Sequence, residues 1–264
     1  HGSLFYFLQD DSLDSRGYFE NRALPANPRN RKQFGAQFDG PLFIPKFYDG
    51  RNPTFFMGAY EGVRGEAITS PFANVPTALM RQGNFSQVST PIINPFTGQQ
   101  FPGNIIPSSM LSPTALNLLK YYPEANLPGV SNNYQGPSPN TDNVDQFLTR
   151  VDQNIGNKIR LNLRYNWHDS FGRNVFNAAI PATQVTQPRV NNNWLGGYTH
   201  TLKPNLLNDF KIGYHRVNFD TLNPFAVDGP ADAGSSLGIP GFDGDVKYSN
   251  PGLPSINISN FAGL

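Results

Sequence analysis

The residues able to perform chemistry are scattered along this sequence and form no complete catalytic or metal-binding pattern. Gly234–Gly238 matches the G-x-S-x-G pattern of a nucleophile elbow, but the flanking residues predict neither the strand nor the helix that an elbow requires. The histidines lack the paired spacing of a zinc site: His1, His168, His200 and His215. Asp243 with Asp245, and Asp142 with Asp145, do not follow the spacing of a calcium loop. We therefore expect no enzymatic activity, no metal and no cofactor.

Composition narrows the class of protein further. The 264 residues include 20 Lys and Arg against 19 Asp and Glu, and a net charge of only +1 does not favour nucleic acid as a partner. The chain contains no cysteine, which excludes a disulfide scaffold and a thiolate nucleophile. Aromatic residues make up 13%, and the chain has 25 Gly and 24 Pro, so strands joined by turns and loops are favoured over helices.

Alternation of apolar and polar residues predicts an all-β protein. The clearest segment is Ile159–His168, in which Ile, Leu, Tyr and Trp alternate with Arg, Asn and His. Further segments of this kind bring the predicted total to seven strands: Leu4–Leu8, Phe34–Phe38, Phe55–Glu61, Phe147–Val151, Trp194–Leu202 and Phe210–Tyr214. We expect these strands to pair in chain order as an antiparallel up-and-down meander, with Leu4–Leu8 beside Phe34–Phe38.

The predicted connections alternate between long and short, as in an outer-membrane barrel with extended external loops and tight periplasmic turns. The long ones are rich in Pro, Gly and Asn: Gln9–Lys32, Val63–Asn143, Asp169–Asn192 and Asp220 onward. The short ones are Pro41–Pro53, Gln153–Lys158 and Lys203–Asn205. The longest loop is predicted to carry short helices, one over Thr114–Tyr122 capped by Ser112 and a weaker one over Val75–Gly83.

The two faces of the predicted sheet differ in chemistry. Charged and amide residues share one parity, and we interpret them as lumen-facing residues that form charge ladders: Glu61, Arg150, Asp152, Arg160, Asn162, Arg164, Asp209 and Lys211. Asp152 and Arg160 are expected to pair across the turn after Val151. Trp167 and Trp194, expected where two successive strands end and begin, are candidates for an aromatic girdle. Parity alone does not distinguish this arrangement from a soluble barrel with its apolar side inward.

Several segments, in chain order, resemble the barrel region of TonB-dependent outer-membrane receptors of the Oar-like kind. The resemblance covers most of the chain, and its segments include His1–Phe7, Gln33–Pro41, Thr54–Gly62, Val75–Ser86, Asn94–Gly98, Pro102–Pro107, Leu118–Pro123, Asp145–Asp152 and Tyr198–Thr201. It implies a large barrel of about 22 strands, closed by an N-terminal plug, that imports a scarce nutrient with energy delivered through TonB.

On this resemblance we expect residues 1–264 to be one part of the barrel domain, lacking the plug and the remaining strands. The expected partners are outer-membrane lipid, the plug and the rest of the barrel of the same protein, TonB only through the plug, and a small-molecule, oligosaccharide or peptide substrate. The expected location is the bacterial outer membrane. The alternative is a soluble or secreted all-β module that binds carbohydrate or acts in adhesion.

Overall fold

The computed structural model describes residues 1–15, 28–227, 233–238, 253 and 255–264, and it divides into two compact units. The sheet unit comprises His1–Ala67, Asn140–Arg173 and Gln187–Thr221. The loop unit comprises Ile68–Pro139, Asn174–Thr186 and Leu222–Leu264. No helix among the described residues is long and apolar enough to cross a membrane.

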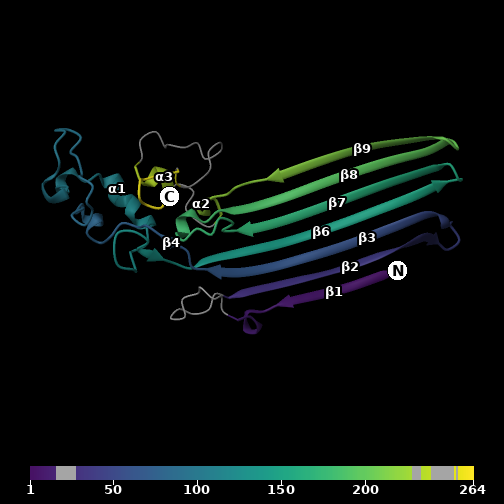
Figure 1. The fold of residues 1–264 in the computed structure, drawn as a ribbon, viewed down its shortest axis with the longest axis horizontal. Coiled ribbons are helices and arrows are strands. Elements are labelled where there is room, and N and C mark those ends of the chain that lie inside the picture. Colours follow the sequence, from purple (N-terminus) through teal and green to yellow (C-terminus); the bar gives the residue numbers. More distant parts are fainter. Residues whose placement is uncertain (16–27, 228–232, 239–252, 254) are drawn as a thin grey trace. The chain divides into compact units, whose positions relative to one another are not determined.

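The sheet unit is a seven-stranded meander in the order β1-β2-β3-β6-β7-β8-β9, as predicted (Figure 1). The strands are β1 Gly2–Gln9, β2 Arg29–Ile44, β3 Tyr48–Thr69, β6 Ser138–Ile155, β7 Ile159–Arg173, β8 Thr186–Lys203 and β9 Leu206–Phe219. The first pairing is confirmed, because Leu4 lies opposite Ala36 and Tyr6 opposite Phe34 in an antiparallel register. The sheet is not closed, so β1 and β9 are its two edges.

The short turns gather at one end of the sheet (Figure 1). The predicted turns within Gln153–Lys158 and Lys203–Asn205 are confirmed, since β7 begins four residues after β6 ends and β9 begins three residues after β8 ends. Gly156 takes a positive φ of 57° in the first of these turns, a conformation that glycine adopts without steric cost.

The predicted connection Pro41–Pro53 is wrong, because both strands continue through most of it. β2 ends at Ile44 and β3 begins at Tyr48, so the turn itself occupies only three residues. The register shifts next to Pro41, which lies opposite Phe55, while the following residue lies opposite Gly50. Residues 51–54 therefore form a bulge, which accommodates Pro53 because a residue outside the ladder does not need a backbone N–H.

Most strands are longer than the alternation predicts, between 14 and 22 residues in β2, β3 and β6–β9. In β2 and β3 part of the extra length lies toward their short turn, and in all six strands part of it lies toward the long connections, where residues such as Asn191–Asn193 are polar on both parities. A bilayer is crossed by about 9–11 residues of a tilted strand, so alternation is required only over that span. The remainder of each strand need not alternate, so the alternation of apolar and polar residues does not predict it.

The loop unit has a small core and several short elements. Its pair of strands is β4 Phe72–Ala73 and β5 Tyr134–Gln135. Its α-helices are α1 Pro113–Leu118, α2 Pro224–Val227 and α3 Ala233–Ser236. The 3-10 helices among the described residues are Asp11–Leu13, Met80–Gln82, Pro102–Asn104, Ser108–Met110, Leu119–Tyr121 and Pro181–Thr183, of which the first belongs to the sheet unit. The core contains Ala73, Val75, Tyr122, Ala179 and Ile180.

The helix predicted over Thr114–Tyr122 is confirmed in part, as α1 followed by a 3-10 turn. Ser112 caps it, with its hydroxyl accepting a hydrogen bond from the backbone N–H of Ala115 at 3.4 Å. The helix predicted over Val75–Gly83 is wrong, because only a 3-10 turn forms before Gly83. The hydroxyl of Thr77 accepts from the N–H of Met80 as a cap does, but Gly83 takes the left-handed conformation, with a φ of 82°, and ends the turn.

Buried polar side chains hold the loop unit together. Asn133 is fully buried, and its amide accepts from the N–H of Val75 and donates to its carbonyl, both at 2.8 Å. Arg81 donates to the carbonyls of Leu119, Tyr122 and Pro123 at 3.0, 2.9 and 2.6 Å. The Tyr122 hydroxyl donates to the carbonyl of Ala262 at 2.7 Å, and burial raises the pKa of this phenol. These bonds tie distant parts of the loop unit to one structure.

Candidate functional site

The register of β6 and β7 places the central charged residues on one face. Arg150 lies directly opposite Arg164, and Asp152 lies opposite Asn162. Directly opposed residues of an antiparallel pair share a face, and alternate residues of one strand do so as well. Arg160, two residues from Asn162, therefore belongs to the same face.

Contacts with the neighbouring strands extend this face across the sheet. The side chain of Asn162 occupies the space where a Cβ on Gly197 would lie, at 2.4 Å, and Gly197 is opposite Lys211. On β3, Tyr60 and Arg64 contact Asp145, whose parity is opposite to that of Arg150. The intervening Glu61 is therefore on the same side as Arg150. The shared face, here called the polar face, carries Glu61, Arg150, Asp152, Arg160, Asn162, Arg164, Asp209 and Lys211.

Charges on the polar face pair along single strands. Arg150 contacts Asp152 at 2.7 Å, and Lys211 contacts Asp209 at 2.9 Å, each two residues away. The predicted pair of Asp152 with Arg160 is wrong, because Arg160 lies opposite Asn154 and its Nε donates to the Asn154 amide oxygen at 3.3 Å. The three-residue turn fixes this register, in which Asp152 lies opposite Asn162.

The opposite face carries at least one aromatic residue on each of the seven strands, and one residue from each strand forms a band across the sheet. This aromatic band consists of Tyr6, Phe34, Tyr60, Phe147, Trp167, Trp194 and Tyr214. The ring centroid of Phe34 lies 6.5 Å from that of Tyr6 and 6.3 Å from that of Tyr60. Phe147 lies opposite Trp167, and Trp194 lies opposite Tyr214. The ring of Tyr165, of the same parity as Trp167, is 4.1 Å from that of Trp194, which joins the two hairpins on one face.

The two tryptophans were expected at strand ends, and this position is wrong. Trp167 is the ninth residue of β7 counted from its short turn, and Trp194 is the tenth of β8 counted the same way, so both lie inside longer strands. Phe147 and Tyr214 are each the ninth residue from their turns. A tilted strand crosses a bilayer in about 9–11 residues. The band thus lies at the distance from the turns at which a strand reaches the far interface.

An ion-paired cluster follows at the level of the band and just beyond it. Arg64 donates two hydrogen bonds to the carboxylate of Asp145, both at 2.8 Å, and a third to the carbonyl of Val144 at 2.8 Å. The Tyr60 hydroxyl donates to the same carboxylate at 2.5 Å. This cluster joins β3 to β6, the two strands separated by the longest insertion in the chain.

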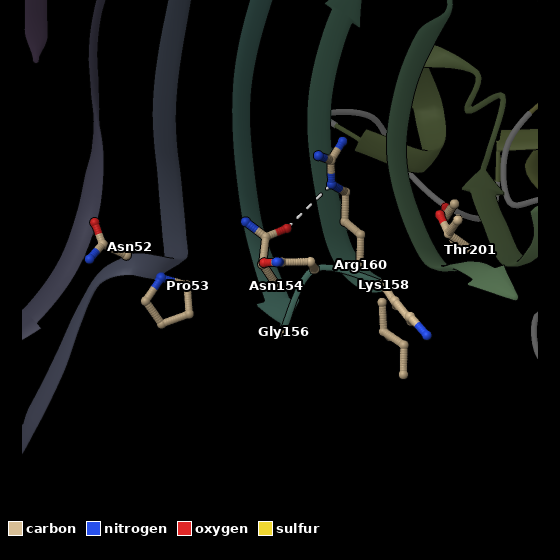
Figure 2. A pocket seen from close by; sticks show the side chains of 10 residues that line it. Asn52, Pro53, Asn154, Gly156, Lys158, Arg160 and Thr201 are labelled. Atoms are coloured by element: carbon tan, nitrogen blue, oxygen red, sulfur yellow. Dashed lines mark hydrogen bonds between the residues drawn. The ribbon is translucent and has the colours of Figure 1, made fainter. Parts of the chain in front are cut away.

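A hollow of about 660 Å³ opens on the polar face near the short turns (Figure 2). Its lining residues come from the bulge of β3, the β6–β7 turn and β8: Asn52, Pro53, Asn154, Gly156, Asn157, Lys158, Ile159, Arg160, Thr199 and Thr201. Figure 2 shows Arg160 beside Asn154, with Lys158 at the turn and Thr201 on the neighbouring strand. The backbone N–H of Thr201 donates to the carbonyl of Lys158 at 2.8 Å and fixes the turn against β8.

Arg160 is among the residues predicted from the sequence, whereas the hollow itself is not. The bulge that brings Asn52 and Pro53 to the edge of the hollow cannot be predicted from the alternation of apolar and polar residues. The cluster of amides and cations in Asn154–Arg160 was the available signal, but those residues also suit an ordinary exposed turn.

A second hollow, of about 420 Å³, lies within the loop unit. Its lining is mainly aromatic and proline residues from three separate connections: Lys120, Tyr121, Tyr122, Pro123, Pro181, Ala182, Pro224 and Phe225. The rings of Tyr121 and Phe225 meet edge to face with centroids 5.3 Å apart. Residues from distant parts of the sequence therefore form one apolar surface.

The described part of the structure brings together no metal-binding cluster. No group of three or more His, Cys, Asp or Glu side chains there is close enough to hold a metal. Asp243 and Asp245 lie outside the described residues. Gly234–Ser236 fall in α3, and residues 228–232, where a preceding strand would have to lie, are also outside the described part.

An antiparallel meander with short turns at one end, one polar face and an aromatic band on the other face is the wall of a transmembrane β-barrel. A sequence model of the outer membrane beta barrel domain family matches residues 1–264, and the chain belongs to this family. The protein is accordingly a barrel-type protein of the outer membrane. No curated protein and no solved structure shows a significant match to the chain.

Proposed function

We propose that this chain forms part of the barrel wall of a TonB-dependent importer of the Oar-like kind, a transport protein and not an enzyme. The observation that carries the proposal is the packed loop unit. The insertion between β3 and β6 and the two later long connections share one core. Val75 and Tyr122 belong to the insertion and Ile180 to the connection before β8, while Ala262 and Leu264, after β9, pack against this core. A folded external surface suits a receptor that selects its substrate, whereas a simple pore needs only an opening.

In this proposal the aromatic face contacts outer-membrane lipid and the polar face lines the lumen. The lumen face would meet the plug domain of the same protein, and TonB would be contacted only through that plug. The remaining strands of the barrel would pair with the edges of β1 and β9. The substrate would be a small molecule, an oligosaccharide or a peptide, and the loop unit would contact it first.

Two measurements on the complete gene product test the proposal. Reconstituted in liposomes, a plugged importer should give negligible swelling in arabinose, whereas a passive pore admits this sugar. In detergent, the complete protein should also bind the purified periplasmic domain of TonB. Swelling at the rate of a porin, or no detectable TonB binding, would refute the TonB-dependent assignment while leaving the membership in the barrel family intact.

A further inference from the structure

The charged side chains that line the hollow near the short turns are all positive. Lys158 and Arg160 are its two cations, and among the described residues that line it none is acidic. Neither cation has an acidic partner within the described part of the chain, whereas Arg150 and Lys211 on the same face are both ion-paired. Lys158, in the turn, and Arg160, on the polar face, thus border one hollow without a neutralising carboxylate among the described residues.

Hydrogen-bond donors complete this lining. The side-chain amides of Asn52 and Asn157 and the hydroxyls of Thr199 and Thr201 also border the hollow. The single bond from Arg160 to Asn154 uses Nε, so the two Nη groups remain to donate elsewhere. Guanidinium, ammonium, amide and hydroxyl groups around one space are the donors that phosphate and carboxylate oxygens require.

The lining is also held in place by backbone structure. The turn that carries Lys158 is tied to β8 by the bond from the Thr201 N–H. Asn52 and Pro53 belong to a bulge within β3, and Arg160 is the second residue of β7, inside the hydrogen-bonded ladder. Both cations therefore extend from elements whose backbone position is set before any ligand arrives.

We propose that this hollow is a binding site for the phosphate or carboxylate group of an anionic solute that passes along the lumen. The proposal rests on the proposed function, because it takes the polar face as the lumen wall. The volume of about 660 Å³ lies within the range of about 300–1,000 Å³ that is typical of small-molecule sites. The apolar hollow of the loop unit, with Lys120 as its one cationic lining residue, has no comparable set of donors.

The test measures binding of pyrophosphate and of citrate to the purified complete protein in detergent, by isothermal titration calorimetry, with sucrose as a neutral probe. The test variant is the double substitution Lys158→Gln and Arg160→Gln. The matched control is Arg164→Gln, which removes a cation from the same face of the same strand outside the hollow. We expect one or both anions to bind, sucrose to show no binding, and the double variant to bind at least about tenfold more weakly.

The control should change affinity by less than about twofold, since exposed charges beyond a Debye length are largely screened in moderate salt. Equal weakening by Arg164→Gln and by the double variant would indicate only the general charge of the face and would overturn the site. Absence of binding by the wild-type protein would overturn it as well. A double variant that binds normally would have the same consequence.

A further outcome identifies a different occupant. If acidic side chains of the plug fill the hollow, the wild-type protein will bind neither anion, and the double variant will unfold at a lower temperature than the control. That result overturns the solute site. Failure of anion binding is separable from failure of the proposed function, because TonB binding and liposome swelling are measured without these anions.

Discussion

Replacing Leu163 with arginine tests which face of the sheet contacts lipid. Leu163 is the fifth residue of β7 from its turn and Trp167 of the aromatic band is the ninth, so Leu163 lies about halfway across the expected membrane span. Its side chain is on the aromatic face, and the residue is 52% exposed. An arginine near the bilayer midplane of a barrel costs about 2–4 kcal/mol. We expect Leu163→Arg to lower the free energy of unfolding by that amount.

The adjacent position provides the matched control at the same depth. Asn162 is on the polar face, where its amide overlies Gly197, and a longer side chain there can extend over the same glycine into water. Nearby Arg164 shows that this face already accepts an arginine. We expect Asn162→Arg to change the free energy of unfolding by less than about 0.5 kcal/mol, the usual effect of a neutral surface substitution.

A third variant separates lipid from a packed protein core, since a core also rejects an unpaired charge. Leu163→Trp should be nearly neutral against lipid, because acyl chains rearrange around the ring, whereas overpacking a core costs about 1–3 kcal/mol. The assay is denaturant unfolding of the complete protein refolded in lipid vesicles. Large losses for both Leu163 variants, or equal losses for Leu163→Arg and Asn162→Arg, would refute the assignment of the aromatic face to lipid.

Two further substitutions test contacts within the sheet. Asp145→Asn should lower the free energy of unfolding of the complete protein by about 1–2 kcal/mol in denaturant unfolding, because it breaks a bidentate pair with Arg64 that is only partly exposed. The matched control is Asp152→Asn, whose partner is on its own strand, and it should cost under about 0.5 kcal/mol. Equal costs would show that the cross-strand pair has no special role. Gly62→Val should cost about 1–3 kcal/mol, since the ring of Phe34 lies 2.6 Å from where a Cβ would stand; an unchanged free energy of unfolding would mean that the ring moves aside freely.

Parity and connection length were enough to predict the order of the strands and the residues that share a face. Each depends on a strict physical rule, because alternate side chains of a strand point to opposite sides and short connections join antiparallel neighbours. Glu61 and Lys211 therefore fall on the predicted face although β3 and β9 are far apart in the sheet. The lumen-facing role of these residues stays a prediction.

The features that escaped prediction depend on contacts between distant residues. The bulge at residues 51–54 replaces the loop expected between Pro41 and Pro53, because prolines can be placed where a strand pair is irregular as well as in a turn. The residue opposite Asp152 depends on the register of β6 against β7, and each residue added to or removed from the turn between them shifts that register. Nothing near Asn133 in the sequence indicates that its amide binds Val75, 58 residues earlier.

The pairing of β4 with β5 bears on the order in which the sheet assembles. Residues 70–137 separate β3 from β6, and closing so long a loop costs about 3 kcal/mol more in chain entropy than closing the three-residue turn after β6. Phe72 lies opposite Gln135 and Ala73 opposite Tyr134, so the two ends of this insertion are joined inside the loop unit. Once the loop unit has folded, β3 and β6 meet as if connected by a tight turn. Folding of the loop unit thus lowers the entropic cost of joining the two halves of the sheet, although the unit lies outside the strands themselves.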